Sequence, residues 1–246
     1  MTPIHISIAS EKIFDIGSFP VTNSLLTSFL VSIGIIIVFA SAGKRAQVNP
    51  MPGIVHAIEA LVEVVLDFID SVIGDRALSE RLLPFIMTFF IFILVNNWIV
   101  LLPGISAIKI GDAQILRSGT ADLNTTIALA IISVVVTQVY GIYNLGIISH
   151  LKKYFSLNPM KLYVGLLELI SEITRLISFS FRLFGSVFAG EVLLIVIAAF
   201  LPVLGPLPFL LLEVLFGLVQ AVVFAMLTLV FMKLAITQQH ESSHST

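Results

Sequence analysis

Two apolar stretches near the C-terminal end of the chain contain several charged side chains. They are Glu168, Glu172, Arg175, Arg182, Glu191 and Glu213. A charged side chain at the centre of a membrane helix costs about 2.5–3.5 kcal/mol on insertion scales, so such residues mark ion paths or ion pairs. A carboxylate can take up and release a proton, whereas an arginine keeps its charge. These residue types therefore point to ion translocation.

Arg182 has no acidic residue one helical turn away. Helical neighbours lie three and four residues apart, and around Arg182 those positions hold serine, phenylalanine and glycine. Glu191 and Glu213 have only apolar residues and glycine there. Arg175 differs, because Glu172 lies three residues before it and favours a structural ion pair. We expect the other three to find partners on other helices, in a water-filled cavity or on another subunit.

Helical register groups the polar residues into stripes. In the first stretch one stripe holds Glu168, Glu172, Arg175, Arg182 and Ser186. In the second stretch a stripe holds Glu213, Gly217 and Gln220. Glu168 and Glu172 either line an aqueous vestibule or lie at the water interface, and both readings stay open on the sequence.

The composition requires lipid as part of the solvent. The chain has 246 residues, 58% of them hydrophobic and 11% charged, whereas a soluble domain carries about 25% charged residues. The net charge of -2 argues against nucleic acid, which calls for a basic patch. The absence of cysteine excludes disulfides, zinc-thiolate sites and thiol catalysis. We read residues 1–22 as an external N-terminal segment without the features of a cleaved signal.

The elements that carry these residues are predicted to be membrane helices, because a crossing needs roughly 20 apolar residues. We expect them at residues 23–42, 82–102, 122–147, 161–200 and 208–236. The fourth would be on the order of 58 Å long, so the last two should form a strongly tilted hairpin. Residues 54–73 carry an acidic stripe, the pattern of an interfacial amphipathic helix. The fold class is all-α integral membrane protein in a single membrane domain.

Lysine and arginine predict the orientation of the chain. If the chain crosses the membrane five times, most lysines and arginines fall on one side of it, whereas Lys12, Lys109 and Arg117 fall on the other. Positive charge marks the cytoplasmic side. The N-terminus is therefore expected outside and the tail, residues 237–246, in the cytoplasm. A bacterial plasma membrane is the expected location, with an organelle inner membrane as the alternative.

Four segments resemble the a subunit of F-type ATP synthases. The stretch from Ser178 to Glu191, SFSFRLFGSVFAGE, is similar to the family signature S-x-x-x-R-L-F-G-N-x-x-A-G-[EH]. Residues 120–126, TADLNTT, resemble T-A-D-x-N-x-T at the outer start of a membrane helix. Residues 94–104 are similar to the N-x-x-x-L-x-P-G helix end, and Glu213 with Gln220 matches polar positions of the final helix. Together the resemblance spans about residues 50–236.

The resemblance implies a role for each matching residue. Arg182 falls on the family's essential arginine, which faces the ion-binding carboxylate of the c ring. Glu191 and Glu213 fall on two polar positions of the outer half-channel, often one Glu and one His; two glutamates depart from a histidine-based relay. Gln220 falls on the polar position facing the arginine. The half-channels are expected to be lined further by Asp122, Asn124, Ser186, Glu168, Glu172 and Arg175.

The function implied is that of the F0 stator subunit, with two half-channels that pass protons to and from the rotating c ring. The chain would not be catalytic alone and would need no cofactor. The partners implied are the c-ring subunits, b-type peripheral stalk subunits and the lipid bilayer. The ion is H⁺ or alternatively Na⁺, since that choice lies mainly in the ring's own site.

Readings from other classes fit the sequence less well. A secondary transporter also buries charges, but it is expected to show inverted repeats, and we detect no repeat. An intramembrane enzyme needs a nucleophile–base pair or a metal cluster, yet the histidines fall at ends, in loops or at the interface. The chain also lacks the G-x-x-x-x-G-K-[ST] phosphate loop. A purely structural subunit would not need Arg182 and Glu191 without local partners.

Overall fold

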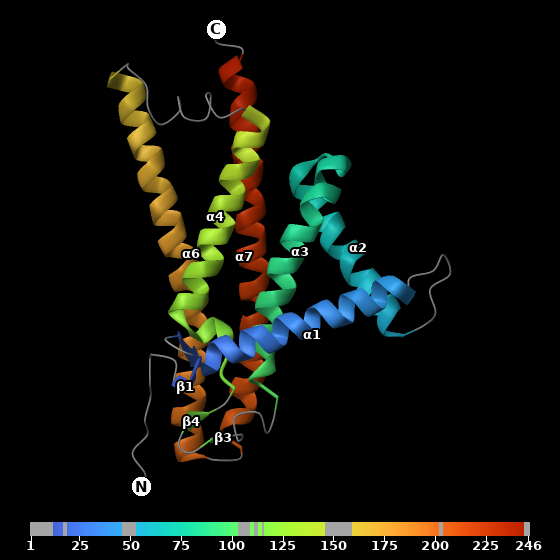
Figure 1. Ribbon diagram of the computed structural model, residues 1–246, viewed down its shortest axis with the longest axis vertical. Helices are drawn as coiled ribbons and strands as arrows, with labels where there is room; N and C mark the ends of the chain where they lie inside the picture. Colours follow the sequence, from blue (N-terminus) through green and yellow to red (C-terminus); the bar gives the residue numbers. More distant parts are fainter. Residues whose placement is uncertain are drawn as a thin grey trace.

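The computed structural model describes residues 12–16, 19–45, 53–102, 109–110, 113–114, 116–145, 159–201 and 204–243. Within these residues the fold is built from long α-helices (Figure 1). They are α1 (Asn23–Arg45), α2 (Ile54–Ile73), α3 (Arg76–Ile99), α4 (Leu123–Leu145), α6 (Pro159–Phe200) and α7 (Pro206–Ser243). A short 3₁₀ helix, η2 (Gly119–Ala121), precedes α4.

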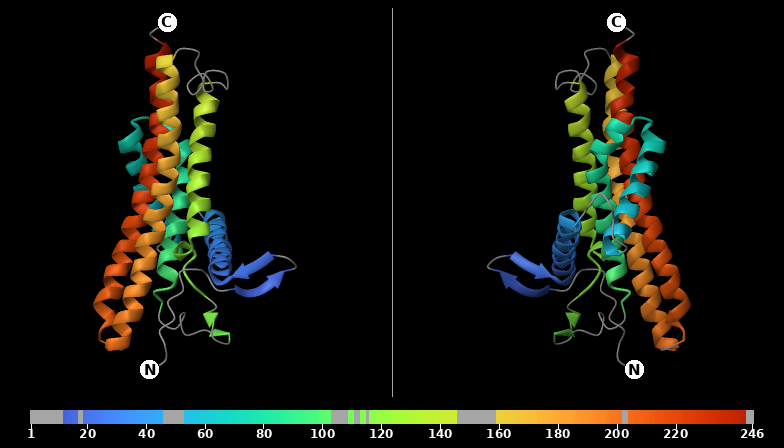
Figure 2. Two further views of the ribbon diagram at one scale, coloured as in Figure 1. Left: turned by 90° about the vertical axis from the view of Figure 1, so that its left-hand side faces the viewer. Right: turned by 90° about the vertical axis from the view of Figure 1, so that its right-hand side faces the viewer.

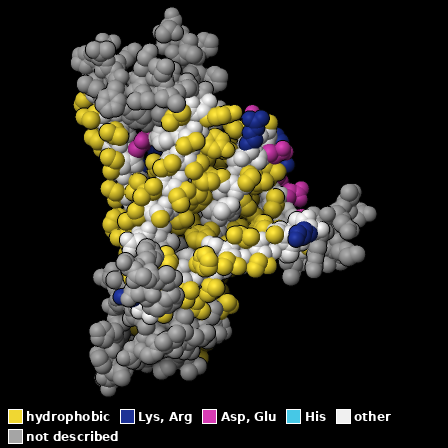
Figure 3. Space-filling view, viewed as in Figure 1, with side chains coloured by type: hydrophobic (Ala, Val, Ile, Leu, Met, Phe, Trp, Pro, Cys, Tyr) yellow, Lys and Arg dark blue, Asp and Glu magenta, His cyan; other side chains and the backbone are white. Residues whose placement is uncertain are grey.

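Five of these helices, α1, α3, α4, α6 and α7, are long and apolar enough to cross a membrane. Helix α2 instead carries the acidic stripe, and Arg76 at the start of α3 forms ion pairs with Asp67 at 3.2 Å and Glu80 at 3.4 Å. Charged side chains on the visible face gather at this α2–α3 corner, while hydrophobic side chains cover the helices (Figure 3). The prediction of an all-α membrane protein is confirmed.

Helix α3 begins at Arg76, earlier than the apolar run that starts at residue 82. The cause is a cap: the Asp75 carboxylate accepts a hydrogen bond from the Ala77 backbone N–H at 3.0 Å. Such a cap satisfies a backbone donor of the first turn. The polar first turn therefore belongs to the helix although hydropathy does not include it.

Two short antiparallel strand pairs were not predicted. Strands β1 (Lys12–Ile16) and β2 (Phe19–Thr22) pair before α1, and β3 (Lys109–Ile110) pairs with β4 (Ala113–Gln114). Both pairs lie between or before the membrane helices, and strands this short give almost no alternating pattern. Residues 146–147, expected to end the third membrane helix, and residues 244–246 of the tail lie outside the described residues.

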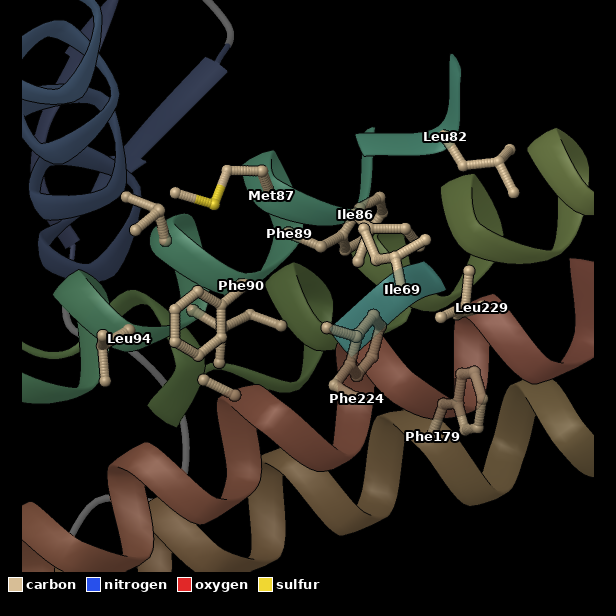
Figure 4. Packing of buried hydrophobic residues seen from close by; sticks show 14 of the residues in the cluster. Ile69, Leu82, Ile86, Met87, Phe89, Phe90, Leu94, Phe179, Phe224 and Leu229 are labelled. Carbon is tan, nitrogen blue, oxygen red and sulfur yellow. The ribbon is translucent and has the colours of Figure 1, made fainter. Parts of the chain in front are cut away.

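The core forms where α3 meets α7 and α6. Phe89 of α3 stacks on Phe224 of α7 with ring centroids 5.4 Å apart, and Phe179 of α6 lies 5.2 Å from the same ring (Figure 4). Between apolar helices in lipid, close packing and interhelical hydrogen bonds provide the association energy. At the far end of α7, Lys233 Nζ donates to the Val72 carbonyl oxygen of α2 at 2.6 Å.

Helix α1 lies across the long axis shared by α6 and α7 (Figure 1), and it is seen nearly end-on in the turned views (Figure 2). Helix α6 has 42 residues and is therefore on the order of 63 Å long, about twice the hydrocarbon core. Two helices that cross in this way cannot both follow the membrane normal. If α1 crosses the membrane, the α6–α7 hairpin has to lie at an angle to it, and the strong tilt of this hairpin stays a prediction.

Candidate functional site

The start of α4 is held by a buried carboxylate. Asp122 accepts hydrogen bonds from the Asn124 backbone N–H at 2.9 Å and from its side-chain Nδ2 at 3.2 Å. The Ser24 hydroxyl of α1 donates to the other carboxylate oxygen at 2.8 Å. Asp122 thus acts as the N-cap of α4 and also ties α4 to α1.

Arg117, which precedes η2, forms an ion pair with Glu191 of α6. The Arg117 Nε lies 3.1 Å from Glu191 Oε2, and the side chains are only 10% and 16% exposed. The sequence predicts Arg117 only in an outer connection between membrane helices, and this contact with Glu191 was not predicted. A signal was available: Glu191 needs a cation from elsewhere, and the connection between the second and third membrane helices offers Lys109 and Arg117.

The segment carrying Arg117 is fixed by contacts with α1 and α3. The Arg117 backbone N–H donates to Thr27 Oγ1 at 3.2 Å, and the Ser118 hydroxyl donates to the Asn96 carbonyl oxygen at 3.0 Å. A Cβ at Gly119 would overlap Ser28 Oγ and lie 2.6 Å from Asn96 Oδ1. A larger residue there would require the Ser28 and Asn96 side chains to shift, so the segment that carries the arginine packs closely against α1 and α3.

Glu213 of α7 lies directly against Gly190 of α6. A Cβ added to Gly190 would come within 2.6 Å of Glu213 Oε1. Glu213 and Ser186 help to line a small pocket of about 10 Å³, about the volume that one water molecule needs. Glu191 is close enough for its charge to act on Glu213. The fold therefore brings the two predicted outer carboxylates together across the hairpin.

Four buried polar atoms have no hydrogen-bond partner within the described residues. They are Ser180 Oγ, Glu191 Oε1, Glu213 Oε2 and Gln220 Nε2. Buried polar groups in proteins are nearly always satisfied by protein or water. Three of the four belong to residues predicted for ion translocation, so the unsatisfied groups are concentrated along the predicted path.

Asn97 and Trp98 of α3 connect that helix to the first third of α7. Asn97 Nδ2 donates to the Gly217 carbonyl oxygen at 3.2 Å, and its Oδ1 accepts from Thr120 Oγ1 at 2.5 Å. Trp98 Nε1 donates to the Val214 carbonyl oxygen at 3.0 Å. With both ends of its amide engaged, Asn97 acts as a positioning group beside Glu213.

Arg182 is exposed on α6 and makes no hydrogen bond or ion pair with any residue that the structure describes. It lies in an open groove of about 450 Å³ between α6 and α7, which Arg175 also lines. Glu191 is nine residues further along α6, a separation of about 14 Å along the helix. The arginine is thus separate from the outer carboxylates.

The predicted stripe on α6 divides between two neighbours. Glu172 faces α4, where the Gln138 amide donates to its carboxylate. Arg175 turns the other way, with its guanidinium carbon 3.6 Å from the centre of the Phe231 ring of α7, a cation–π contact. Glu168 is partly buried one turn before Glu172. Within the described residues, no cluster of three or more His, Asp or Glu is placed to hold a metal.

The chain is similar to known proteins over most of its length. The model of the family described as ATP synthase A chain matches residues 25–233. An ATP synthase subunit a from Moorella thermoacetica is 30% identical over 220 residues, covering 89% of this chain and 93% of that protein. One from Legionella pneumophila (strain Paris) is 32% identical over 229 residues, covering 93% and 92%.

Proposed function

Because the chain belongs to the ATP synthase A chain family, we propose that Arg182, Glu191, Glu213 and Gln220 form its proton path, in which the two glutamates are the groups that can take up and release a proton. Members of this family are the stator component of the F0 proton channel, and the chain is a multi-pass membrane protein with that function. The route of the proton, the residues along it and the partner proteins are our proposal.

The outer half-channel leads from the start of α4 to the α6–α7 hairpin. Asp122 and Asn124 stand at its mouth, and Glu191 and Glu213 lie further in. The unsatisfied oxygens of the two glutamates support this route, since water molecules would satisfy them. A proton passes from this water to a carboxylate of the adjoining c ring.

Arg182 carries the proposal, because it is an exposed permanent charge in a membrane helix and has no partner within the described residues. A charge in this setting calls for an anionic group, which a neighbouring protein must supply. The ring carboxylate fits: protonated, it can turn into lipid, whereas the charged form has a large desolvation cost. Arginine suits the task because it stays charged when desolvated. The buried amide of Gln220 supports this contact from α7.

The inner half-channel runs between α4 and α6. Glu168 and Glu172 line it, with Gln138 bound to Glu172, and Arg175 lies at the neighbouring groove. The ring carboxylate releases its proton here and is then drawn to Arg182. The membrane potential supplies about 2.3 kcal/mol per charge per 100 mV. The translocated ion is H⁺, with Na⁺ as the alternative set by the ring.

The partners and the location follow from the family and the surface. The exposed apolar side chains of α6, among them Ile173, Ile177 and Phe181, suit contact with the c ring and lipid. The b-type peripheral stalk subunits complete the stator, and the chain is not catalytic alone. The lysine and arginine asymmetry supports an orientation with the N-terminus outside and the C-terminus in the cytoplasm. The membrane we propose is a bacterial plasma membrane, with an organelle inner membrane as the alternative.

The substitution Arg182→Ala tests the function. ATP synthesis and ATP-driven proton pumping should be lost, while passive proton leak can rise because the barrier between the half-channels is gone. Arg182→Lys should also fail, since lysine lacks the planar fork and can lose its proton when buried. Both rates are measured in inverted membrane vesicles with the amount of assembled subunit checked.

The matched control is Arg81→Ala, which removes an exposed arginine from the first turns of α3 and should leave both rates unchanged. An Arg182→Ala enzyme that assembles and makes ATP at the normal rate would refute the proposed function.

A further inference from the structure

Arg117 is a buried cation beside the outer carboxylates that the mechanism above does not use. Its guanidinium Nε lies 3.1 Å from Glu191 Oε2, and both side chains are nearly removed from solvent. In such surroundings the attraction between opposite charges is much stronger than in water. Removing one partner of a buried pair leaves an uncompensated charge, which is strongly unfavourable.

The arginine cannot easily move away from this place. Its backbone N–H is bound to α1 through Thr27, the next residue is bound to α3 through Asn96, and Gly119 leaves no space behind them. The cation is therefore a fixed part of the outer half-channel. Glu191, on the facing helix, has to meet it.

Glu213 has a different environment. Its Oε2 has no hydrogen-bond partner within the described residues, and it lines the pocket with room for about one water molecule. The charged group facing it from α6 is Glu191, whose charge acts on it directly; Arg117 lies behind Glu191. Helix α3 presents only the amide of Asn97 and the indole of Trp98, both already bound to α7.

We propose that Arg117 assigns different tasks to the two outer carboxylates. Glu191 stays bound to the guanidinium as its fixed counter-anion, and Glu213 takes up the proton and passes it to the ring. Protonating Glu191 would give up its ion pair with a buried guanidinium, whereas protonating Glu213 removes the repulsion between two neighbouring carboxylates. The remaining free oxygen of Glu191, Oε1, acts as a fixed acceptor for the water that leads to Glu213. This inference rests on the proposed function.

The test compares single and double substitutions in the complete enzyme. Glu213→Gln should lower ATP-driven proton pumping about 100-fold, at the lower end of what a positioned proton-transfer group contributes. Glu191→Gln should lower the pumping rate per assembled subunit clearly less, because the glutamine keeps the shape and Glu213 remains. The loss of the ion pair with Arg117 should instead lower the amount of assembled subunit. Arg117→Gln should lower pumping about tenfold, because Glu191 then takes up protons in competition with Glu213. A change of this size lies within the usual range of interaction energies between residues in direct contact.

The double substitution Arg117→Gln, Glu191→Gln gives the sharpest outcome. It removes the stranded charge, so it should pump faster than Arg117→Gln alone. The pH profile of pumping should broaden in Arg117→Gln, where two carboxylates take up protons, and return to a single step in the double variant. A purely structural arginine would change the amount of assembled subunit but not this profile. Glu63→Gln and Arg81→Gln, both exposed, are the matched controls.

Two results would overturn the inference. One is an equal loss of proton pumping in Glu191→Gln and Glu213→Gln; the other is a double variant that pumps no faster than Arg117→Gln when equal amounts are assembled. The comparison of Glu191→Gln with Glu213→Gln leaves Arg117 in place. It therefore tests the inference even if Arg117→Gln fails to assemble. If Arg182→Ala is inactive and either of these two results is found, the assignment of tasks to Glu191 and Glu213 is refuted and the proposed function stands. Normal pumping in both Arg182→Ala and Glu213→Gln would instead refute the proposed function.

Discussion

The substitution Gly190→Ala should impair proton transfer without removing any polar group. The added Cβ would lie 2.6 Å from Glu213 Oε1 and 3.0 Å from its Cδ. Ordinary contact needs about 3.5 Å, so the carboxylate must shift by about 0.9 Å. A misplacement of about 1 Å can cost on the order of 100-fold in rate. We therefore expect ATP-driven pumping in inverted vesicles to fall between about tenfold and 100-fold.

Gly34→Ala is the matched control for this substitution. Gly34 lies inside α1 with nothing within 4 Å of an added Cβ, so pumping should stay normal. In both variants alanine favours the helix by roughly 1 kcal/mol over glycine, and assembly should not suffer. Shortening the displaced side chain with Glu213→Asp should restore part of the activity in the Gly190→Ala background. Pumping by Gly190→Ala at the rate of Gly34→Ala, with equal assembly, would show that the position of Glu213 is not critical.

Two further predictions concern the inner half-channel and the orientation. Gln138→Leu removes the hydrogen-bond donor to Glu172, and a hydrogen bond to a charged group contributes about 1.5–3 kcal/mol, so pumping should fall. If the two residues act as a unit, the double variant Gln138→Leu, Glu172→Leu should pump no slower than Glu172→Leu alone. Because the chain contains no cysteine, Thr246→Cys introduces a unique label, which an impermeant maleimide should reach only from the cytoplasmic side; labelling from outside alone would reverse the proposed orientation.

The helices could be predicted from the sequence because membrane crossing imposes a length and a composition. The need of Glu191 for a partner was also predictable, since helical neighbours are fixed by spacing. The identity of that partner was not, because Arg117 reaches Glu191 only through the course of an irregular segment. That course depends on contacts with α1 and α3, which no local pattern encodes.

The division of the α6 stripe escaped prediction for a different reason. Glu172 and Arg182 lie about 80° apart around the helix axis, which counts as one face when the helix is considered alone. Once α4 and α7 pack on either side, that angle is enough to give the two residues different neighbours. Which residues share an environment is therefore decided by helix packing, and helical spacing gives only the candidates.

The attachments of α7 also have a mechanical consequence. The helix is bound to α3 through Asn97 and Trp98 in its first third and to α2 through Lys233 in its last third. A rotating ring exerts a sideways drag on the helices that touch it, and a helix held at one point would pivot under that load. In the proposed contact with the ring, α7 held at two separated points would resist turning. The torque would pass to α2 beside the α2–α3 corner through Lys233 and to the opposite end of α3 through Asn97 and Trp98.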